Sequence, residues 1–174
     1  PASLLNRDDA GLAKRIPFGD AIRLRVSSQC LKRHWREDLT QRLPELPDGL
    51  RTRSFFTRTV LPKAVAAGIG EAMASSLIEP LAKAVIDGGV KEGGDLNQPV
   101  LLGLREADYF VQMLVQVSRE EDPTKALAER LKSKEEKDNL KAMSKSGAGL
   151  TAALFGRMVT SDLLARVDAP VHVA

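Results

Sequence analysis

The side chains with the clearest capacity for chemistry are cationic or hydroxylated, and they gather in one short stretch near the start of the chain. Two arginines alternate with apolar residues, and two serines, a glutamine and three further cations follow. The set comprises Arg23, Arg25, Ser27, Ser28, Gln29, Lys32, Arg33 and Arg36. On a helix the last four stand at i, i+3, i+4 and i+7 and share one face. The N–H groups of a helix start also favour anions, so the stretch predicts a site for more than one phosphate.

The elements that position these side chains follow from the same stretch. Strict apolar–polar alternation over residues 21–26 predicts a half-buried strand with both arginines on its open face. The two serines can cap a helix that begins near Gln29, and Pro44 ends it. The predicted buried stripe of that helix consists of Leu31, Trp35, Leu39 and Leu43. An ordinary amphipathic helix with a basic exposed face is the alternative.

The next predicted element is a long helix in the middle of the chain. Pro62 fits its first turn, and Pro80 should kink or divide it before a flexible connector at residues 88–94. Its apolar face is formed by Val65, Ile69, Met73, Leu77, Leu81 and Val85.

Two further helices are predicted after the connector. The first runs from about Leu102 to Arg119, and the second opens at Asp122-Pro123, an N-cap followed by proline. Residues 132–141 alternate in charge and are interpreted as a solvated face. The apolar face of the first of these helices consists of Phe110, Met113, Leu114 and Val117.

The last part of the chain is predicted to return to strands, at residues 150–159 and 170–174. The order of strand, helix, helical block and strands indicates an α+β fold in which a sheet is interrupted by a large helical insertion. The predicted domain parts are residues 1–48 with the strand–helix junction, residues 49–146 as the insertion, and residues 147–174 as returning strands.

Composition narrows the class of protein. The chain has 174 residues, of which 43% are hydrophobic and 28% charged, as in a globular domain. One cysteine excludes an intrachain disulfide and a Cys-x-x-Cys zinc site. Neither a membrane-spanning run nor a leader is evident, so we expect a cytoplasmic protein without membrane partners. The net charge is +5 over residues 1–58, −2 over 59–146 and zero over 147–174, which indicates a polyanion partner for the first third.

Two enzymatic interpretations are alternatives to binding. Cys30 and His34 lie one helical turn apart, but no carboxylate partner is evident for the imidazole. Asp8 and Asp9 could hold a divalent metal for a metal-dependent ribonuclease, although adjacent loop acids more often cap a turn. A helical scaffold that binds only protein is the third possibility. We expect no cofactor, no metal site and no catalytic residue.

Several short segments at the two ends of the chain also carry a resemblance. The early segments are Leu5-Asn6-Arg7-Asp8-Asp9, Phe18-Gly19 and Arg23-Leu24-Arg25-Val26-Ser27-Ser28-Gln29-Cys30-Leu31-Lys32-Arg33. The later segments are Gly156-Arg157-Met158-Val159-Thr160-Ser161, Val167-Asp168 and His172-Val173-Ala174. Together they resemble a known family, the CRISPR-associated Cascade backbone subunit (CasC) of type I-E systems. The resemblance spans nearly the whole chain but only the N-terminal half of such a subunit. We therefore expect a fragment, whose first strand precedes Pro1 and whose thumb and remaining palm follow Ala174.

The resemblance implies an RRM-like (ferredoxin-like) palm sheet, incomplete in this chain, and a non-catalytic protein that polymerises along CRISPR RNA. Its implied partners are CRISPR RNA, target DNA through the guide, further copies of itself and other Cascade subunits. The positions matched to RNA-backbone contacts are Ser27, Gln29, Lys32 and Arg33. Arg7 matches a loop residue near the RNA, Lys14 a target-facing position, and Met158 a methionine against kinked bases. Asp20 departs from the Gly-Gly pair often found in the family.

Physical reasoning from composition agrees with that role. A protein that binds any guide sequence must contact phosphates and sugars rather than base edges. The chain holds five Phe, one Tyr and one Trp, which argues against aromatic stacking platforms. Met158 could then act as an apolar wedge between bases, the alternative being a core methionine.

Overall fold

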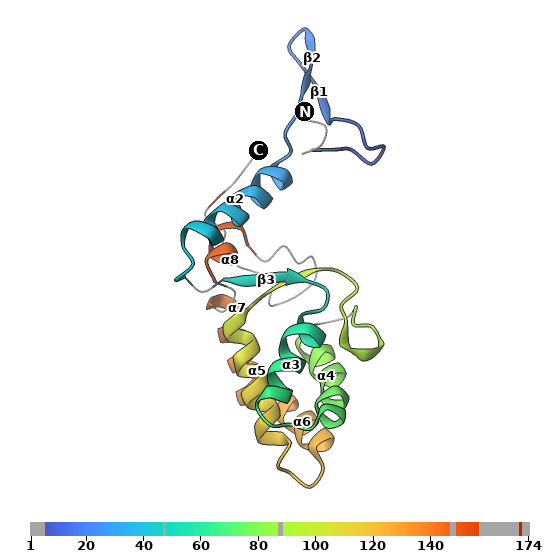
Figure 1. The fold of residues 1–174 in the computed structure, drawn as a ribbon, viewed down its shortest axis with the longest axis vertical. Helices are drawn as coiled ribbons and strands as arrows, with labels where there is room; N and C mark the ends of the chain where they lie inside the picture. The colour runs from blue at the N-terminus through green and yellow to red at the C-terminus, as the bar shows by residue number, and fades with distance from the viewer. Residues whose placement is uncertain (1–5, 47, 87–88, 147–148, 157–170, 172–174) are drawn as a thin grey trace. The chain divides into compact units, whose positions relative to one another are not determined.

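The computed structural model describes residues 6–46, 48–86, 89–146, 149–156 and 171 (Figure 1). The chain divides into two compact units. Unit 1 comprises residues 1–45 and 171–174, and unit 2 comprises residues 46–170.

Unit 1 contains an antiparallel hairpin of β1 (Arg15–Phe18) and β2 (Ala21–Leu24). Its two-residue turn contains Gly19 at φ 68°, a left-handed conformation that hairpin turns of this length require. The predicted strand is therefore present but ends at Leu24. Its predicted half-burial is wrong, because every residue of both strands is exposed. No second layer covers either face of the hairpin within the described part of unit 1.

Helix α2 (Ser28–Arg42) begins where the sequence predicts, with Ser27 as its N-cap. Its predicted buried stripe is wrong, because α2 contains no buried residue and Trp35 is exposed. Leu31, Leu39 and Leu43 are half-buried. The spacing of four residues correctly predicts a helix. Spacing alone does not show whether another element packs against that helix.

Unit 2 contains the second sheet and the helical block. A π-helix, η1 (Phe56–Val60), leads directly into α3 (Leu61–Ala66), and α4 (Glu71–Val85) follows. The division of the predicted long helix lies at Gly68, not at Pro80, which sits inside α4. Gly68 has φ 97°, and the N–H groups of Gly68 and Ile69 donate to the carbonyls of Val65 and Ala64 at 3.0 and 3.2 Å. This pattern is a Schellman motif, which ends a helix.

The connector predicted to be flexible is ordered over its described residues, 89–94, and Asp87 and Gly88 lie outside them. It contains a 3-10 turn, η2 (Glu92–Gly94), whose Gly93 N–H donates to the Glu79 carboxylate at 2.8 Å. Gly94 is buried so closely against α4 that an added Cβ would lie 2.6 Å from Cγ2 of Ile78. Gly94 thus allows close packing, and Gly93, at φ 83°, allows the turn.

Strands β3 (Gly49–Thr52) and β4 (Val100–Gly103) form an antiparallel ladder that the sequence analysis missed. Because β4 occupies residues 100–103, helix α5 (Leu104–Val117) starts two residues later than predicted. The Glu106 carboxylate accepts the Gly103 N–H at 2.6 Å and fixes this start. The predicted apolar face is confirmed, because Phe110, Met113, Leu114 and Val117 are all buried.

Helix α6 (Pro123–Lys132) is confirmed with its predicted cap, since the Asp122 carboxylate accepts the Lys125 N–H at 3.0 Å. The solvated face predicted for residues 132–141 has an exception in α7 (Lys134–Ser146), where Glu136 is buried. Its carboxylate accepts from Nε of Arg130 at 2.9 Å and from the Tyr109 hydroxyl. Burial, together with the bond to this carboxylate, raises the pKa of Tyr109.

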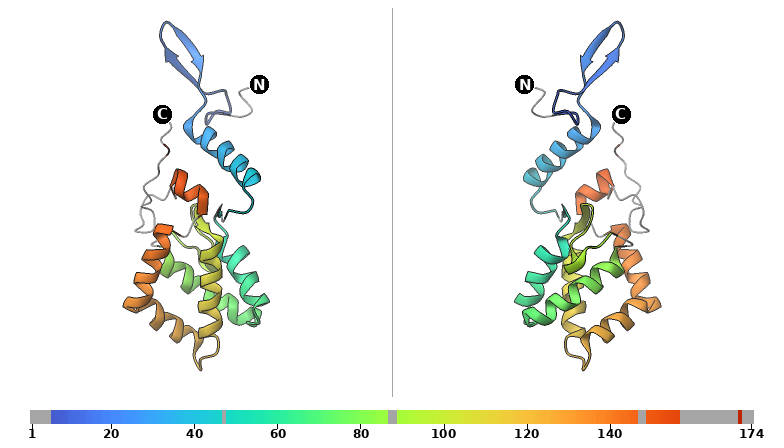
Figure 2. Two further views of the ribbon diagram at one scale, coloured as in Figure 1. Left: turned by 90° about the vertical axis from the view of Figure 1, so that its left-hand side faces the viewer. Right: turned by 90° about the vertical axis from the view of Figure 1, so that its right-hand side faces the viewer.

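The core of unit 2 lies around α5, which contacts η1, α3, α6 and β4 (Figure 2). Phe56 packs against Phe55 and Phe110, with ring centroids 5.6 and 5.8 Å apart. The largest fully buried side chains are Phe55, Phe56, Phe110, Leu77, Ile78, Leu81, Leu96, Leu102, Met113, Leu114 and Leu127.

The strand predicted at residues 150–159 is contradicted over its described part. Residues 149–155 form helix α8 (Gly149–Phe155), with Ala152 and Phe155 buried. Ala152 and Ala153 favour a helix, and the short apolar run did not distinguish the two structures. Most of residues 157–174 lie outside the described residues.

These elements confirm the predicted fold class, mixed α+β. Two small antiparallel sheets accompany a helical block, consistent with an incomplete ferredoxin-like sheet and a helical insertion. Of the helices that the structure describes, none is both long and apolar enough to cross a bilayer.

Candidate nucleic-acid interface

The strand–helix junction of unit 1 is held together by one buried side chain, Asn6. Its Oδ1 accepts from the backbone N–H of Ser27 at 3.1 Å and from the Ser27 hydroxyl at 3.0 Å. Its amide nitrogen donates to the carbonyl of Arg25. Asn6 is 7% exposed, so these bonds satisfy polar groups that water does not reach. The side chain therefore fixes residues 25–27 against the loop that precedes the hairpin.

That loop, residues 6–14, is closed by its own hydrogen bonds. The Lys14 N–H donates to the carbonyl of Asn6 at 3.2 Å, and the Arg25 N–H donates to the carbonyl of Lys14 at 2.9 Å. Oδ1 of Asp8 accepts the N–H groups of Ala10 and Leu12 at 3.0 and 2.8 Å. Asp8 thus closes a turn, the role expected of a loop acid. Within the described residues, no group of three or more His, Cys, Asp or Glu could hold a metal ion.

Ser27 performs the predicted capping, and the cap occupies its hydroxyl. The hydroxyl accepts the Cys30 N–H at 3.3 Å while it donates to Asn6. Ser27 is itself buried. We therefore interpret Ser27 as the residue that orients the start of α2, with Ser28 and Gln29 in the first turn beside it. Gln29 is exposed and Ser28 is half-buried.

The basic side chains surround this junction on several elements. Arg23 and Arg25 are exposed, and the Arg23 guanidinium lies 5.5 Å from the ring centroid of Phe18. Arg7, in the loop, is exposed, and Lys14 is half-buried. Since the Asn6 bonds fix the backbone of Arg25 and the start of α2, the loop, strand and helix that carry these cations meet at one junction.

The cations of α2 differ in how far they are already neutralised. Nε of Arg33 lies 2.9 Å from the Glu37 carboxylate, and that bond lowers the pKa of Glu37. Lys32 and Arg36 are half-buried, and none of the ion pairs found among the described residues includes Lys32. Lys32 therefore offers its full charge to an anion, whereas Arg33 must leave Glu37 or share with it.

The expectation that His34 lacks a carboxylate partner needs correction. His34 does have a nearby carboxylate, because its Nδ1 lies 3.6 Å from Oε2 of Glu37. Both side chains are exposed, and Glu37 is bonded to Arg33, so this is a surface charge cluster. Met158 lies outside the described residues.

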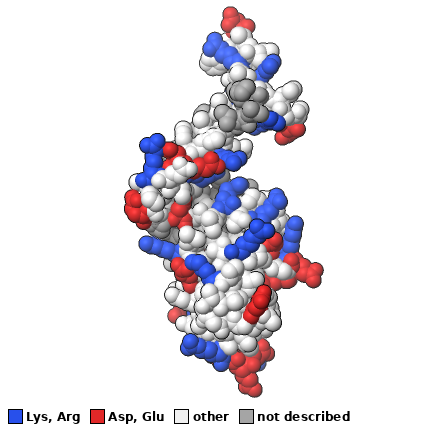
Figure 3. All heavy atoms as spheres, in the orientation of Figure 1, with Lys and Arg blue, Asp and Glu red and all other residues white. Residues whose placement is uncertain are grey.

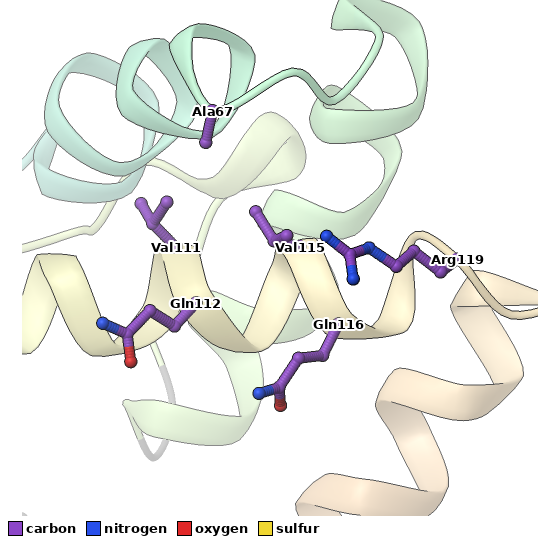
Figure 4. Close-up of a pocket in the computed structure, with 6 residues that line it drawn as sticks. All are labelled: Ala67, Val111, Gln112, Val115, Gln116 and Arg119. Atoms are coloured by element: carbon purple, nitrogen blue, oxygen red, sulfur yellow. The ribbon is translucent and has the colours of Figure 1, made fainter.

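A shallow depression on α5 was not foreseen from the sequence. Ala67 faces Val111 and Val115 across it, and Gln112 and Gln116 point to the other side (Figure 4). Arg119 is the one ionisable residue of its lining. It offers an apolar floor but no group for acid, base or nucleophilic chemistry.

The role of Asn6 was not predicted from the sequence, because no periodicity links it to Arg25 and Ser27, which lie 19 and 21 residues later. Asn6 belongs to one of the segments that resemble the known family, but no function was assigned to it. An asparagine ahead of a hairpin by itself predicts only a turn.

Comparisons with known proteins place this fold. One similar solved chain belongs to a structure described as a CRISPR RNA-guided surveillance complex, with a TM-score of 0.62 and 23% sequence identity. The match covers 91% of this chain and 49% of that one, so the chain spans about half the length of its structural neighbour. No curated protein matches the sequence. A family model described as CT1975-like protein matches residues 1–174, and the chain therefore belongs to the CT1975-like protein family.

Proposed function

We propose that this chain is part of a CRISPR RNA-binding backbone subunit of a Cascade-type surveillance complex, and that it contributes binding rather than catalysis. The observation that carries the proposal is the junction of unit 1. There the bonds of Asn6 hold the start of α2 beside the exposed Arg23 and Arg25, with Lys32 on the helix. Family membership and the fold of the neighbour support the same role.

The chemistry of the junction fits an RNA backbone better than a base sequence. Its donors are guanidinium, ammonium and amide groups, which bind phosphate and sugar oxygens of any nucleotide. The exposed aromatic side chains there are Phe18, whose ring lies beside Arg23, and Trp35. Stacking on either ring would accept any base, so binding should depend on charge and shape and little on base identity.

The finer parts of the proposal follow the family resemblance. Copies would polymerise along the guide and present it for pairing with target DNA, in a cytoplasmic type I-E complex with other Cascade subunits. Residues 1–48 and 147–174 would belong to an RRM-like palm, and residues 49–146 would form its helical insertion. Arg7, Arg36, Lys14 and Met158 would add contacts around the guide, with Lys14 on the target-facing side and Met158 at a kink of the bases.

Lys32→Ala tests the junction directly. Because the ammonium is not neutralised by an ion pair, its loss should weaken binding to mixed-sequence single-stranded RNAs alike. The slope of log K against log salt should fall by about 0.7, the value for one phosphate contact on a single strand. Fluorescence anisotropy titrations of the whole chain at several salt concentrations measure both quantities.

Two companion variants sharpen this test. Lys125→Ala removes an exposed lysine from α6 of unit 2 and should leave the slope unchanged. Glu37→Gln releases Arg33 from its ion pair and should tighten binding. A loss that depends on base sequence, or an unchanged slope for Lys32→Ala, would contradict backbone recognition at the junction.

A further inference from the structure

Near its start, unit 2 contains a stretch with several basic residues and no acidic ones. Residues 49–70 include Arg51, Arg53, Arg58 and Lys63 but neither Asp nor Glu. In α6 and α7, by contrast, lysines alternate with acidic side chains. The stretch therefore differs from the mixed-charge surface that is usual for a solvated face.

Arg51 lies in β3, and Arg53 follows Thr52, the last residue of that strand. Leu50 and Thr52 pair with Leu102 and Val100, both in the main core. Arg51 pairs instead with Leu101, which packs with Ala152 of α8 outside that core. Because side chains alternate along a strand, Arg51 points to the sheet face turned away from the main core. Arg51 and Arg53 are both exposed.

Arg58 extends this row from the helix that follows. Its N–H donates to the carbonyl of Ser54 at 2.8 Å, so it lies one turn beyond the residue next to Arg53. Helical side chains lean toward the N-terminus of their helix, which directs Arg58 back toward that strand end. Arg58 is exposed. Basic side chains gather at the level of β3 in the space-filling view (Figure 3).

None of these three arginines forms an ion pair with another described residue. The ion pairs of unit 2 found there join Lys63 to Asp108, Lys83 to Glu79 and Arg130 to Glu136. The Asp95 carboxylate accepts from the hydroxyl of Thr57, the residue before Arg58, at 2.6 Å. Among the described residues Lys63 is therefore paired with an acid, and the three arginines form no ion pair.

We propose that Arg51, Arg53 and Arg58 form a second contact for a nucleic-acid phosphate backbone, on unit 2 and in addition to the junction of unit 1. Three exposed arginines within residues 51–58 suit several phosphates of a backbone better than one small anion. Guanidinium groups bind phosphates through paired N–H donors. Phe55 and Phe56, the aromatics of the same stretch, are fully buried, so the contact reads no bases.

The test uses the whole chain with Arg51, Arg53 and Arg58 all changed to Ala. Binding is measured to a mixed-sequence single-stranded RNA and, in a second arm, to a DNA duplex, each over a series of salt concentrations. The salt slope for RNA should fall by about 2, from three contacts at about 0.7 each. A fall confined to the duplex arm would identify double-stranded DNA as the ligand. Thermal unfolding should not change, because the three side chains are exposed.

A matched variant removes the same charge elsewhere on unit 2. Lys125, Lys132 and Lys137 are exposed on α6 and α7 among acidic residues, and changing them to Ala should leave both slopes intact. Equal slopes for the arginine and lysine variants would overturn the second contact. If Lys32→Ala then still lowered the slope, the proposed function would stand without it. A wild-type chain that binds neither nucleic acid would overturn both proposals.

Discussion

Among the described residues, each unit contains one antiparallel ladder with four residues per strand, and the two ladders differ in burial. Every residue of β1 and β2 is exposed, whereas in the ladder of unit 2 every residue of β4 is buried and those of β3 are half-buried or exposed. The two buried residues in the described part of unit 1 are Asn6 and Ser27, both polar and bonded to each other. Unit 2 instead buries aromatic and aliphatic side chains around α5.

This difference shows that the two units are stabilised by different interactions. Burial of apolar surface stabilises unit 2 in proportion to the area removed from water. In unit 1 hydrogen bonds fix the geometry of the junction, and each contributes only about 1 kcal/mol net. Such a junction is specific in shape but less strongly stabilised than an apolar core.

The largest effect should come from the core of unit 2. Phe110→Ala removes a fully buried ring that packs on Phe56 and leaves a cavity. The expected cost is about 3–5 kcal/mol of unfolding free energy. Amide hydrogen exchange, resolved by unit, measures it, and protection should fall across α3 to α6. Unchanged exchange in unit 2 would contradict the core assigned to α5.

Hydrogen-bonding caps and helical periods allowed much of this fold to be predicted. Ser27 and the Asp122-Pro123 pair are local signals, and both helix starts are where they indicate. The apolar face of α5 has the period of a buried helix and is buried. These features depend on residues within one or two turns, so the sequence carries them directly.

Features that depend on distant partners were missed. β3 and β4 pair across about fifty residues, and neither four-residue strand has an alternation long enough to predict it. The wrong predictions of a buried face on α2 and of a flexible connector around Gly93 and Gly94 have the same cause. Whether a side chain is buried, and how closely two elements approach, depend on the neighbouring elements. The residues of one element alone do not predict this.

The candidate site also contains residues that the sequence predicts and one that it does not. Its cations, such as Lys32 and Arg25, can be predicted from their charge and spacing. The side chain that holds them together, Asn6, bonds to residues 19 and 21 positions later and gave no such signal.

The second largest effect should come from this polar connection. Asn6→Ala leaves the Ser27 N–H without its partner in a buried position, at an expected cost of about 1–3 kcal/mol. Exchange of the Ser27 and Cys30 amides should accelerate while unit 2 keeps its protection. The matched change Asn139→Ala removes an exposed side chain with one bond of 3.3 Å, to the Tyr109 hydroxyl, and should change little. If the two variants behaved alike, the junction would not depend on Asn6.

The smallest effect is expected in the exposed hairpin, and it sharpens the comparison most. Ile22 in β2 is 72% exposed and Leu102 in β4 is 1% exposed, so the same truncation to Ala tests both ladders. Ile22→Ala should change stability by no more than about 0.5 kcal/mol, as surface substitutions do, whereas Leu102→Ala should cost about 2–5 kcal/mol. Denaturant unfolding, with exchange resolved by unit, separates the two. A cost for Ile22→Ala close to that for Leu102→Ala would mean that the hairpin is covered in solution, and unit 1 would then have an apolar core of its own.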